Sequence, residues 1–298
     1  MSCLAQAQKV KSLVLGLEVF KSTTMNYYTI DPPKELVEHV RFFWVLEGKP
    51  TALRPFVHRA LAEHCAELIF YYKGGFKILS DNHAPGDTFS SGIYGPTQQF
   101  YQFKTEKEFG MLGVYLYPYA IPRLFALPAS ELSNGMLDFE TLCGQEGKLL
   151  EEQVVMASGN SERVQLISKF LTMQLRKSRT QNSGILYQIR NIVQSYQLTS
   201  VPALASECHL SRRQFERKFK ELSGFSPKEF QRLIRFDAVV KGRFPVERSL
   251  AQLAAACGFY DQSHFIHEFQ RFSGYSPKEF FKQKIAPSSY RAAPEFRL

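Results

Sequence analysis

Over about the first 120 residues, apolar side chains occur in short runs separated by glycine and proline. The runs at 66–72 and 76–79 flank a Lys-Gly-Gly turn, and this arrangement predicts a β-hairpin. Two further runs, at 99–104 and 111–117, predict two more strands. Short strands at such close intervals favour an antiparallel barrel or sandwich.

Beyond Pro122 the apolar positions recur at intervals of three or four residues, which predicts helices. Ser161 is the expected N-cap of one of them. One face of this helix is apolar along its whole length: Val164, Ile167, Phe170, Leu171 and Leu175. Such a stripe either packs on the strands or forms the seam of a dimer.

A polar segment separates this region from the rest of the chain. Residues 176–184 contain no apolar side chain and predict a linker. The expected parts are a domain over 1–175, strand-rich and then helical, a second domain over 185–285, and a tail over 286–298. A chain of 298 residues fits two domains of ordinary size. The expected fold class is α+β, with an antiparallel β-barrel and helices in the first domain and an all-α second domain.

The C-terminal part contains an internal repeat. Gly-Phe-Ser-Pro-Lys-Glu-Phe at 224–230 returns as Gly-Tyr-Ser-Pro-Lys-Glu-Phe at 274–280. In each copy Ser is the expected N-cap, Pro occupies the first helical position and Glu completes a capping box. Each copy also closes a short apolar helix, a sharp turn and a longer amphipathic helix. The pattern predicts two helix-turn-helix units, joined by a helix from Pro227 to about Gly242.

The first unit starts at Ser200, the expected cap of a short helix, and turns at 208–210. Ser211 and Gln214 then form a capping box for the second helix. One face of that helix is apolar: Phe215, Phe219 and Leu222. The opposite face is mostly basic: Arg212, Arg213, Glu216, Arg217 and Lys220. We expect Glu216 to pair with Lys220 four residues on rather than to read a base.

The second unit repeats this plan with less charge. Ser249 and Gln252 form a capping box before an alanine-rich helix, and Gly258 suits a left-handed turn. Asp261 is the expected N-cap of the longer helix. The buried face of this helix is expected to carry Phe265, Phe269 and Phe272. Its outward face carries Gln262, Ser263, His264, His267 and Arg271.

The positive charge of the chain lies almost entirely in the half that contains the repeat. Residues 184–298 hold 18 Lys and Arg against 10 Asp and Glu, whereas residues 1–183 hold 19 against 18. A basic domain joined to a nearly neutral one suggests that only the basic domain meets a polyanion.

Cysteine usage and apolar run lengths exclude several classes of protein. The five cysteines are scattered without a Cys-x-x-Cys pair, so we expect neither a disulfide framework nor a structural zinc site. No apolar stretch approaches the about 18 residues of a membrane span. The run at 13–15 is too short for a signal peptide. We therefore expect a cytoplasmic protein with no membrane partner, no cofactor and no bound metal.

The region from about Gly184 to Lys284 resembles the paired helix-turn-helix domain of the AraC/XylS family of bacterial transcription regulators. The resemblance is carried by Gly-Phe-Tyr-Asp-Gln-Ser-His-Phe at 258–265 and by Gly-Tyr-Ser-Pro at 274–277. It implies a sequence-specific regulator rather than an enzyme. Such a protein binds promoter DNA, activates transcription and contacts RNA polymerase. The implied base-reading residues are Arg213, Glu216 and Arg217 in the first unit and Gln262, Ser263, His264 and His267 in the second.

The chemistry of these side chains agrees with such roles. Arg213 or Arg217 can donate two hydrogen bonds to guanine, and Gln262 can pair with adenine. The helix that starts at Pro227 would be roughly 24 Å long at 1.5 Å per residue, which suits two reading helices in adjacent major grooves. The remaining cations are expected to contact phosphates, which position a protein without reading sequence: Arg212, Lys220 and Arg271.

In the same family, the DNA-binding domain often follows a cupin-like barrel that senses an effector or forms a homodimer. The strand-rich region here is similar in layout. Aromatic residues are abundant there and suit the walls of an apolar pocket for a small-molecule effector. The side chains expected to line or orient a ligand in it are Arg54, His58, Arg59 and Tyr71.

Two alternatives stay open for the N-terminal part. The first is a metal-dependent cupin enzyme fused to the DNA-binding domain, with ligands drawn from His58, His64, His83, Glu63 and Glu67. The compact His-x-His cluster of such enzymes is missing, which favours structural roles for these residues. The second is a regulator without a ligand, controlled by a protein partner.

Overall fold

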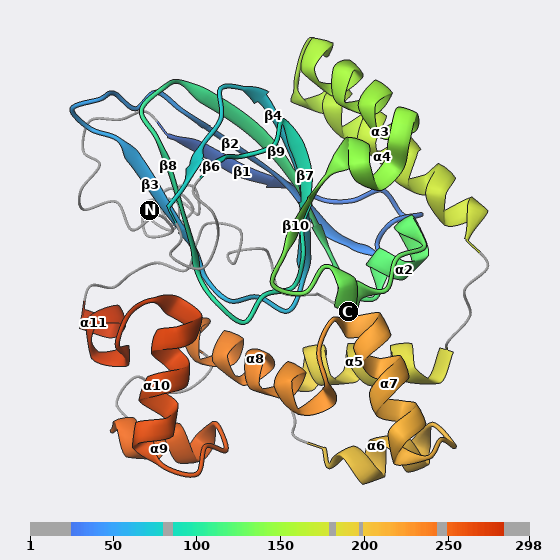
Figure 1. Cartoon of the computed structure of the whole chain (residues 1–298), viewed down its shortest axis with the longest axis vertical. Coiled ribbons are helices and arrows are strands. Elements are labelled where there is room, and N and C mark those ends of the chain that lie inside the picture. Colours follow the sequence, from blue (N-terminus) through green and yellow to red (C-terminus); the bar gives the residue numbers. More distant parts are fainter. Residues whose placement is uncertain (1–24, 80–85, 179–182, 197–198, 243–248, 283–298) are drawn as a thin grey trace, which may run out of the picture.

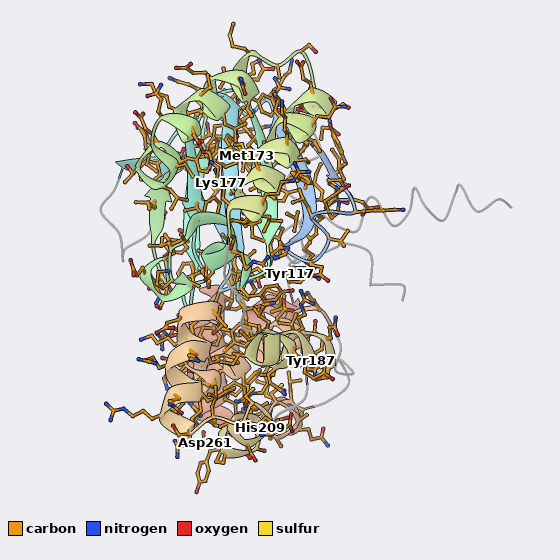
Figure 2. All side chains as sticks on the ribbon, turned by 90° about the vertical axis from the view of Figure 1, so that its right-hand side faces the viewer. Tyr117, Met173, Lys177, Tyr187, His209 and Asp261 are labelled. Atoms are coloured by element: carbon orange, nitrogen blue, oxygen red, sulfur yellow. The ribbon has the colours of Figure 1, made fainter. Side chains whose placement is uncertain are left out.

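The computed structural model describes residues 25–79, 86–178, 183–196, 199–242 and 249–282. Two sheets and their covering helices form one half of the molecule, and the C-terminal helices form the other (Figure 1). Figure 2 shows the two halves stacked end to end, with Tyr117 near their junction. Within these ranges no helix is long and apolar enough to cross a membrane.

The larger sheet is antiparallel throughout, with strand order β1-β2-β9-β4-β7-β10. The central strand β9 is buried along its whole length. Gly113 of β9 lies opposite Trp44 of β2, and a Cβ at this glycine would collide with the indole. The strands are β1 (Asn26–Ile30), β2 (Val40–Gly48), β4 (Ala66–Lys73), β7 (Ser91–Tyr94), β9 (Phe109–Leu116) and β10 (Met136–Asp138).

The smaller sheet contains β3 (Phe56–Ala60), β8 (Tyr101–Thr105), β5 (Lys77–Ile78) and β6 (Gly86–Asp87), in that order. Among the described strands none of one sheet pairs with a strand of the other, so the predicted barrel does not close. The likeness to a cupin depends on that barrel and stays a prediction.

The predicted hairpin over 66–79 is wrong. Strand β4 pairs with β9 and β7, whereas β5 pairs with β8 and β6, so the turn between them carries the chain from one sheet to the other. Gly74 makes this turn with a φ of 64°, and the carbonyl of Glu108 lies where a Cβ would stand. Glycine therefore marks a tight turn here, but not a hairpin turn.

Alternation along the strands produces two cores. On one face of the larger sheet, aromatic side chains such as Phe42, Trp44 and Tyr115 pack towards the smaller sheet. On the other face, residues such as Phe43 and Phe70 pack against helices. These helices are α2 (Ala120–Phe125), α3 (Phe139–Met156) and α4 (Asn160–Lys177), with a 3-10 turn, η2 (Ala129–Glu131).

The N-cap of helix α4 lies two residues before the predicted one. Gly159, not Ser161, is its N-cap, because Arg163 N already donates to Gly159 O. The apolar stripe of this helix packs on the sheet, since Ile167, Phe170 and Leu171 are buried in the same core as β4 and β9. The stripe is therefore not free to form a dimer seam.

The C-terminal half is entirely helical in the described residues. Its helices are α5 (Ser183–Ser195), α6 (Val201–Glu207), α7 (Arg212–Ser223), α8 (Pro227–Val240), α9 (Leu250–Ala256), α10 (Gln262–Ser273) and α11 (Pro277–Lys282). Helices α6 and α7 form the first helix-turn-helix unit, and α9 and α10 form the second. The predicted linker overlaps the end of α4 and the start of α5. Residues 179–182 within it, the tail 286–298 and His83 lie outside the described residues.

The predicted helix starts of both units are confirmed. Capping boxes form at Ser211, Ser226 and Ser249, each with the predicted Gln or Glu three residues on. Asp261 accepts a hydrogen bond from His264 N at 2.8 Å, and Gly258 has a φ of 66°. These caps fix where each helix begins and therefore which side chains face outward.

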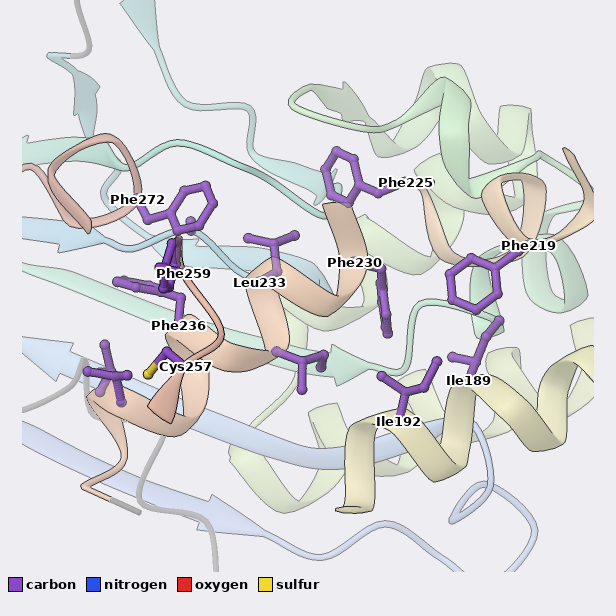
Figure 3. Packing of buried hydrophobic residues seen from close by; sticks show 14 of the residues in the cluster. Ile189, Ile192, Phe219, Phe225, Phe230, Leu233, Phe236, Cys257, Phe259 and Phe272 are labelled. Atoms are coloured by element: carbon purple, nitrogen blue, oxygen red, sulfur yellow. The ribbon is translucent and has the colours of Figure 1, made fainter. Parts of the chain in front are cut away.

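Helix α8 is the common spine of the two units. It has 14 residues, roughly 21 Å at 1.5 Å per residue. At its first end Phe230 packs edge-on against Phe219 of α7, with ring centroids 5.5 Å apart. At its other end Phe236 packs on Phe269 of α10 and on Phe272 of the same helix, the latter labelled in Figure 3. One continuous core therefore sets the distance between α7 and α10.

Candidate nucleic-acid interface

Helix α7 presents an exposed basic face. Phe215 and Phe219 are fully buried on its inner face. The cations on its outer face are exposed to solvent: Arg213, Arg217 and Lys220. Two ion pairs run along the exposed surface. Arg212 Nε donates to Glu216 Oε1 at 3.0 Å, and Arg217 Nε lies 3.9 Å from Glu221 Oε1.

The predicted ion pair between Glu216 and Lys220 is wrong, because Glu216 turns back to Arg212 one turn earlier. At the helix surface this pair contributes at most a few tenths of a kcal/mol. The Arg212–Glu216 ion pair can therefore break at little cost in free energy, which frees both side chains to contact phosphates or bases.

Helix α10 presents an exposed polar face with little charge. Gln262, Ser263, His264 and His267 are all exposed. Glu268 does not join them: it is 6 % exposed, and its carboxylate lies 3.1 Å from Arg232 Nη1 of α8. The acidic residues of this helix therefore cap it or are neutralised inside the domain.

The first residues of α7 and α10 lie at the end of the molecule that is remote from the sheets. Figure 2 shows His209, in the turn before α7, and Asp261, the cap of α10, at that end. In helix-turn-helix proteins the first residues of the second helix contact base edges. The predicted base-reading side chains are therefore accessible on both helices.

The C-terminal ends of α7 and α10 contact the N-terminal domain. At the end of α7, Ser133 Oγ donates to Gly224 O at 2.6 Å. At the end of α10, Arg59 Nη1 donates to Gly274 O at 3.1 Å, and its guanidinium lies 3.9 Å from the ring centroid of Tyr275. The two repeat glycines, both with positive φ, are thus matched points of attachment.

Further contacts join α10 and α5 to the N-terminal domain. Ala62 N donates to Phe272 O at 2.7 Å, and Arg271 Nη2 donates to Gln98 Oε1 at 3.2 Å. Arg190 of α5 reaches Tyr119 and Glu38. Arg271, a predicted phosphate contact, is therefore engaged by the N-terminal domain in this structure. Sequence patterns gave no signal for these partners, because they lie more than 70 residues away along the chain.

A cavity of about 60 Å³ lies between the two sheets. Aromatic and aliphatic side chains make up most of its walls, and two predicted pocket residues, His58 and Tyr71, line it. Burial lowers the pKa of His58 to about 4 and raises that of Tyr71 to about 12, so both side chains are neutral near pH 7. Arg59 turns away to the C-terminal domain, and Arg54 is exposed and outside the cavity lining.

Two protein-family models match parts of the chain. Residues 28–138 match the family model of a domain of unknown function (DUF6597), and residues 204–283 match that of a helix-turn-helix domain. None of the curated proteins compared with the chain matches it.

Solved structures resemble the chain at low identity. ToxT from Vibrio cholerae is 15% identical and has a TM-score of 0.42, covering 88% of this chain and 99% of its own. The DNA-binding domain of AdpA, in complex with a target DNA, is 24% identical with a TM-score of 0.29, covering 38% and 93%. The AraC-like transcriptional activator CuxR is 14% identical with a TM-score of 0.31, covering 74% and 96%.

The family match covers both predicted units, from α6 to the end of α11. It agrees with the capping boxes at Ser211 and Ser249, the left-handed glycines that end α7 and α10, and the repeated Ser-Pro-Lys-Glu starts. Residues 204–283 are therefore a helix-turn-helix domain of the AraC type, joined here to a sheet-rich N-terminal domain.

Proposed function

We propose that this protein is a sequence-specific transcription regulator that docks α7 and α10 in adjacent major grooves of promoter DNA. The observation that carries the proposal is the AraC-type domain with the starts of both reading helices exposed at one end of the molecule. The basic excess of residues 184–298 supports a polyanionic partner.

The two helices bind DNA by different chemistry. In α7, Arg213 and Arg217 donate to guanine O6 and N7, each such pair contributing about 1–3 kcal/mol of discrimination. In α10, Gln262 pairs with adenine, while Ser263, His264 and His267 reach neighbouring base edges. Glu216 accepts from cytosine N4 once it leaves Arg212.

Phosphate contacts position both helices. Arg212 and Lys220 stand on the exposed side of α7, where DNA phosphates flank a docked helix. Arg271 joins them after its guanidinium leaves Gln98. Since α7 carries most of this charge, the first unit supplies most of the electrostatic affinity.

The N-terminal domain adjusts this binding in response to a small effector in the cavity between the sheets. A cavity of about 60 Å³ has room for roughly four water-sized positions, so the effector is small or widens the cavity on binding. Aromatic and aliphatic walls favour an apolar body, and His58 and Tyr71 offer hydrogen bonds to a polar group. The protein acts in the cytoplasm as an activator through RNA polymerase, with homodimerisation as a further property of the N-terminal domain.

The test is selection of bound sequences from a random DNA library with the full-length protein at two salt concentrations. The expected result is two short half-motifs about one helical turn apart. The control variant is Lys228→Ala, which removes an exposed cation at the start of α8, away from the outward faces of α7 and α10. It should select the same two half-motifs as the wild type. Binding without sequence preference at both salt concentrations would exclude the proposed regulator.

A further inference from the structure

Glu63, His64 and Cys65 form a compact cluster at the junction of the two domains. They lie between β3 and β4, where the chain bends after Glu63 pairs with Thr97 through two backbone hydrogen bonds. Because of this bend, three consecutive side chains converge instead of alternating. One donor atom from each of the three lies within 4.8 Å of the other two.

All three side chains are buried, with exposed fractions of 8 % for Glu63, 1 % for His64 and 2 % for Cys65. Nδ1 of His64 lies 2.7 Å from Glu63 Oε1, which is an ion pair when the imidazole is protonated, and the side chain of Cys65 also interacts with this ring. The buried imidazole is therefore held between a carboxylate and a thiol, and all three groups are metal ligands when they have lost their protons.

A coordinated cation would take the place of the proton between His64 and Glu63 and would bind all three side chains. Carboxylate, imidazole and thiolate are the donors that Zn²⁺ accepts in proteins, and three protein ligands with one open position make a complete zinc site. Tetrahedral coordination would place the nitrogen and the carboxylate oxygen roughly 3.4 Å apart, a displacement of less than about 1 Å from the present distance. Glu63 and Cys65 also line the cavity between the sheets, so the fourth coordination position would face this cavity.

The charges at this place also suit a divalent ion. A carboxylate and a thiolate contribute two negative charges, and Arg41 lies within electrostatic range of both. With the ion bound, the cluster and Arg41 would together carry a single positive charge. Because Arg41 already neutralises part of this negative charge, it would weaken the binding of the metal ion and make that binding reversible.

The cluster contacts helix α8, which joins the two helix-turn-helix units, and the residue before it in sequence contacts the second unit. The ring of His64 packs edge-on against Phe230 of α8, with centroids 5.8 Å apart, and Phe230 packs on Phe219 of α7. On the other side of the cluster, Ala62 N donates to Phe272 O at the end of α10. Figure 3 shows Phe230 on α8 and Phe272 of α10 on opposite sides of the view.

We propose that Glu63, His64 and Cys65 bind a divalent cation of the zinc class, and that the bound ion changes how the N-terminal domain holds the two units. The second clause rests on the proposed DNA-binding function, whereas the first does not. Coordination would fix the His64 ring, and through Phe230 it would restrict the movement of α8 and α7 relative to the sheets.

The first test measures metal alone. Full-length protein stripped with a chelator is dialysed against Zn²⁺, and bound metal is counted; Co²⁺ is then used as a spectroscopic substitute. We expect one ion per chain and a thiolate-to-cobalt absorption band. Cys65→Ser should abolish the band and weaken binding by roughly tenfold or more, while Cys208→Ser, at a half-buried cysteine in the turn of the first unit, should change neither.

Wild-type protein that retains no metal after dialysis would overturn the site, as would a Cys65→Ser variant with unchanged affinity. If Cys65→Ser fails to fold, as judged by circular dichroism, Glu63→Gln and the cobalt spectrum of the wild type decide the question. No charge-transfer band in the wild type would then exclude cysteine coordination.

The second test measures coupling. Binding of the selected DNA is followed by fluorescence anisotropy with and without saturating Zn²⁺. A change in Kd of roughly threefold or more in the wild type, absent in Cys65→Ser, would support coupling. Metal binding with an unchanged Kd would overturn coupling alone, and loss of all specific DNA binding with intact metal binding would count against the proposed function instead.

Discussion

The two helix-turn-helix units share a fold but differ in surface chemistry. Helix α7 exposes arginine and lysine along one face, whereas α10 exposes glutamine, serine and histidine, and its single arginine is bound to Gln98. Their interiors are nearly identical, with phenylalanines at matching positions buried against α8. The comparison suggests that the first unit supplies most of the electrostatic attraction to DNA, whereas both units carry side chains that can read bases.

The largest expected effect tests whether the two interiors are equivalent. Phe219→Ala and Phe269→Ala each remove a ring that is at most 1 % exposed, and each should lower the free energy of unfolding by about 3–5 kcal/mol. Chemical denaturation measures both. The control Tyr260→Ala removes a side chain that is 96 % exposed and should change stability by less than about 0.5 kcal/mol.

A marked inequality between the two phenylalanine variants would contradict the common spine. A small loss for Phe269→Ala alone, for instance, would mean that the second unit adds little to the shared core. The distance between α7 and α10 would then not be set by α8.

The next effect separates the two reading surfaces. Arg217→Ala should weaken specific binding by about 1–3 kcal/mol and relax preference at a guanine. Gln262→Ala should cost a similar amount at an adenine, with little change in salt dependence because no charge is lost. Anisotropy titrations on the selected sequence and on single-base variants measure both. Equal losses on every sequence would show that neither residue reads bases.

An acid-sensitive contact lies on the side of the junction near the first unit. His39 is 7 % exposed beside Tyr119, and burial, with help from Arg123 and Arg190, lowers its pKa from 6.5 to about 4. Between pH 7 and pH 5 the unfolded chain takes up a proton at this histidine and the folded chain does not. The free energy of unfolding should therefore decrease as the pH is lowered from 7 to 5, and His39 should account for on the order of 1–2 kcal/mol of that decrease.

Denaturation of wild type and His39→Gln at both pH values measures this contribution. The variant should lose less stability than the wild type between pH 7 and pH 5. A loss that is the same in both proteins would show that His39 titrates alike in the folded and unfolded states.

The smallest effect concerns phosphates. Lys220→Ala should lower the slope of log affinity against log salt by about one, since the exposed ammonium releases one counterion. Arg271→Ala should lower it by less, because its guanidinium must first leave Gln98. Titrations at several salt concentrations compare the two slopes. A larger drop for Arg271→Ala would mean that the second unit carries the electrostatic contact.

The C-terminal domain could be predicted from sequence because its signals are local. Capping pairs such as Ser211 with Gln214 lie three residues apart, and the phenylalanines recur at helical spacing, so short segments determine helix starts and buried faces. The prediction failed where two local partners competed for one group. Glu216 has a cation on either side at one helical turn, and sequence spacing alone does not choose between Arg212 and Lys220.

The N-terminal domain was less predictable because strand pairing depends on residues far apart. Strands were expected at 66–72 and 111–117, but nothing local indicates that they pair with one another rather than with their neighbours in sequence. The same holds for Ser133 with Gly224 and for His64 with Phe230, which meet only when the domains dock. Sequence reasoning placed Glu63 and His64 among candidate metal ligands but did not group them with Cys65, because consecutive side chains in an extended segment normally point apart.

The most direct test of the account is to select DNA sequences separately with the wild type, Arg217→Ala and Gln262→Ala, all as full-length proteins. We predict that each variant loses information in one half-motif only, and that the two affected half-motifs lie about one helical turn apart. Loss of the same positions in both variants, or of none, would contradict the claim that α7 and α10 read two separate stretches of DNA.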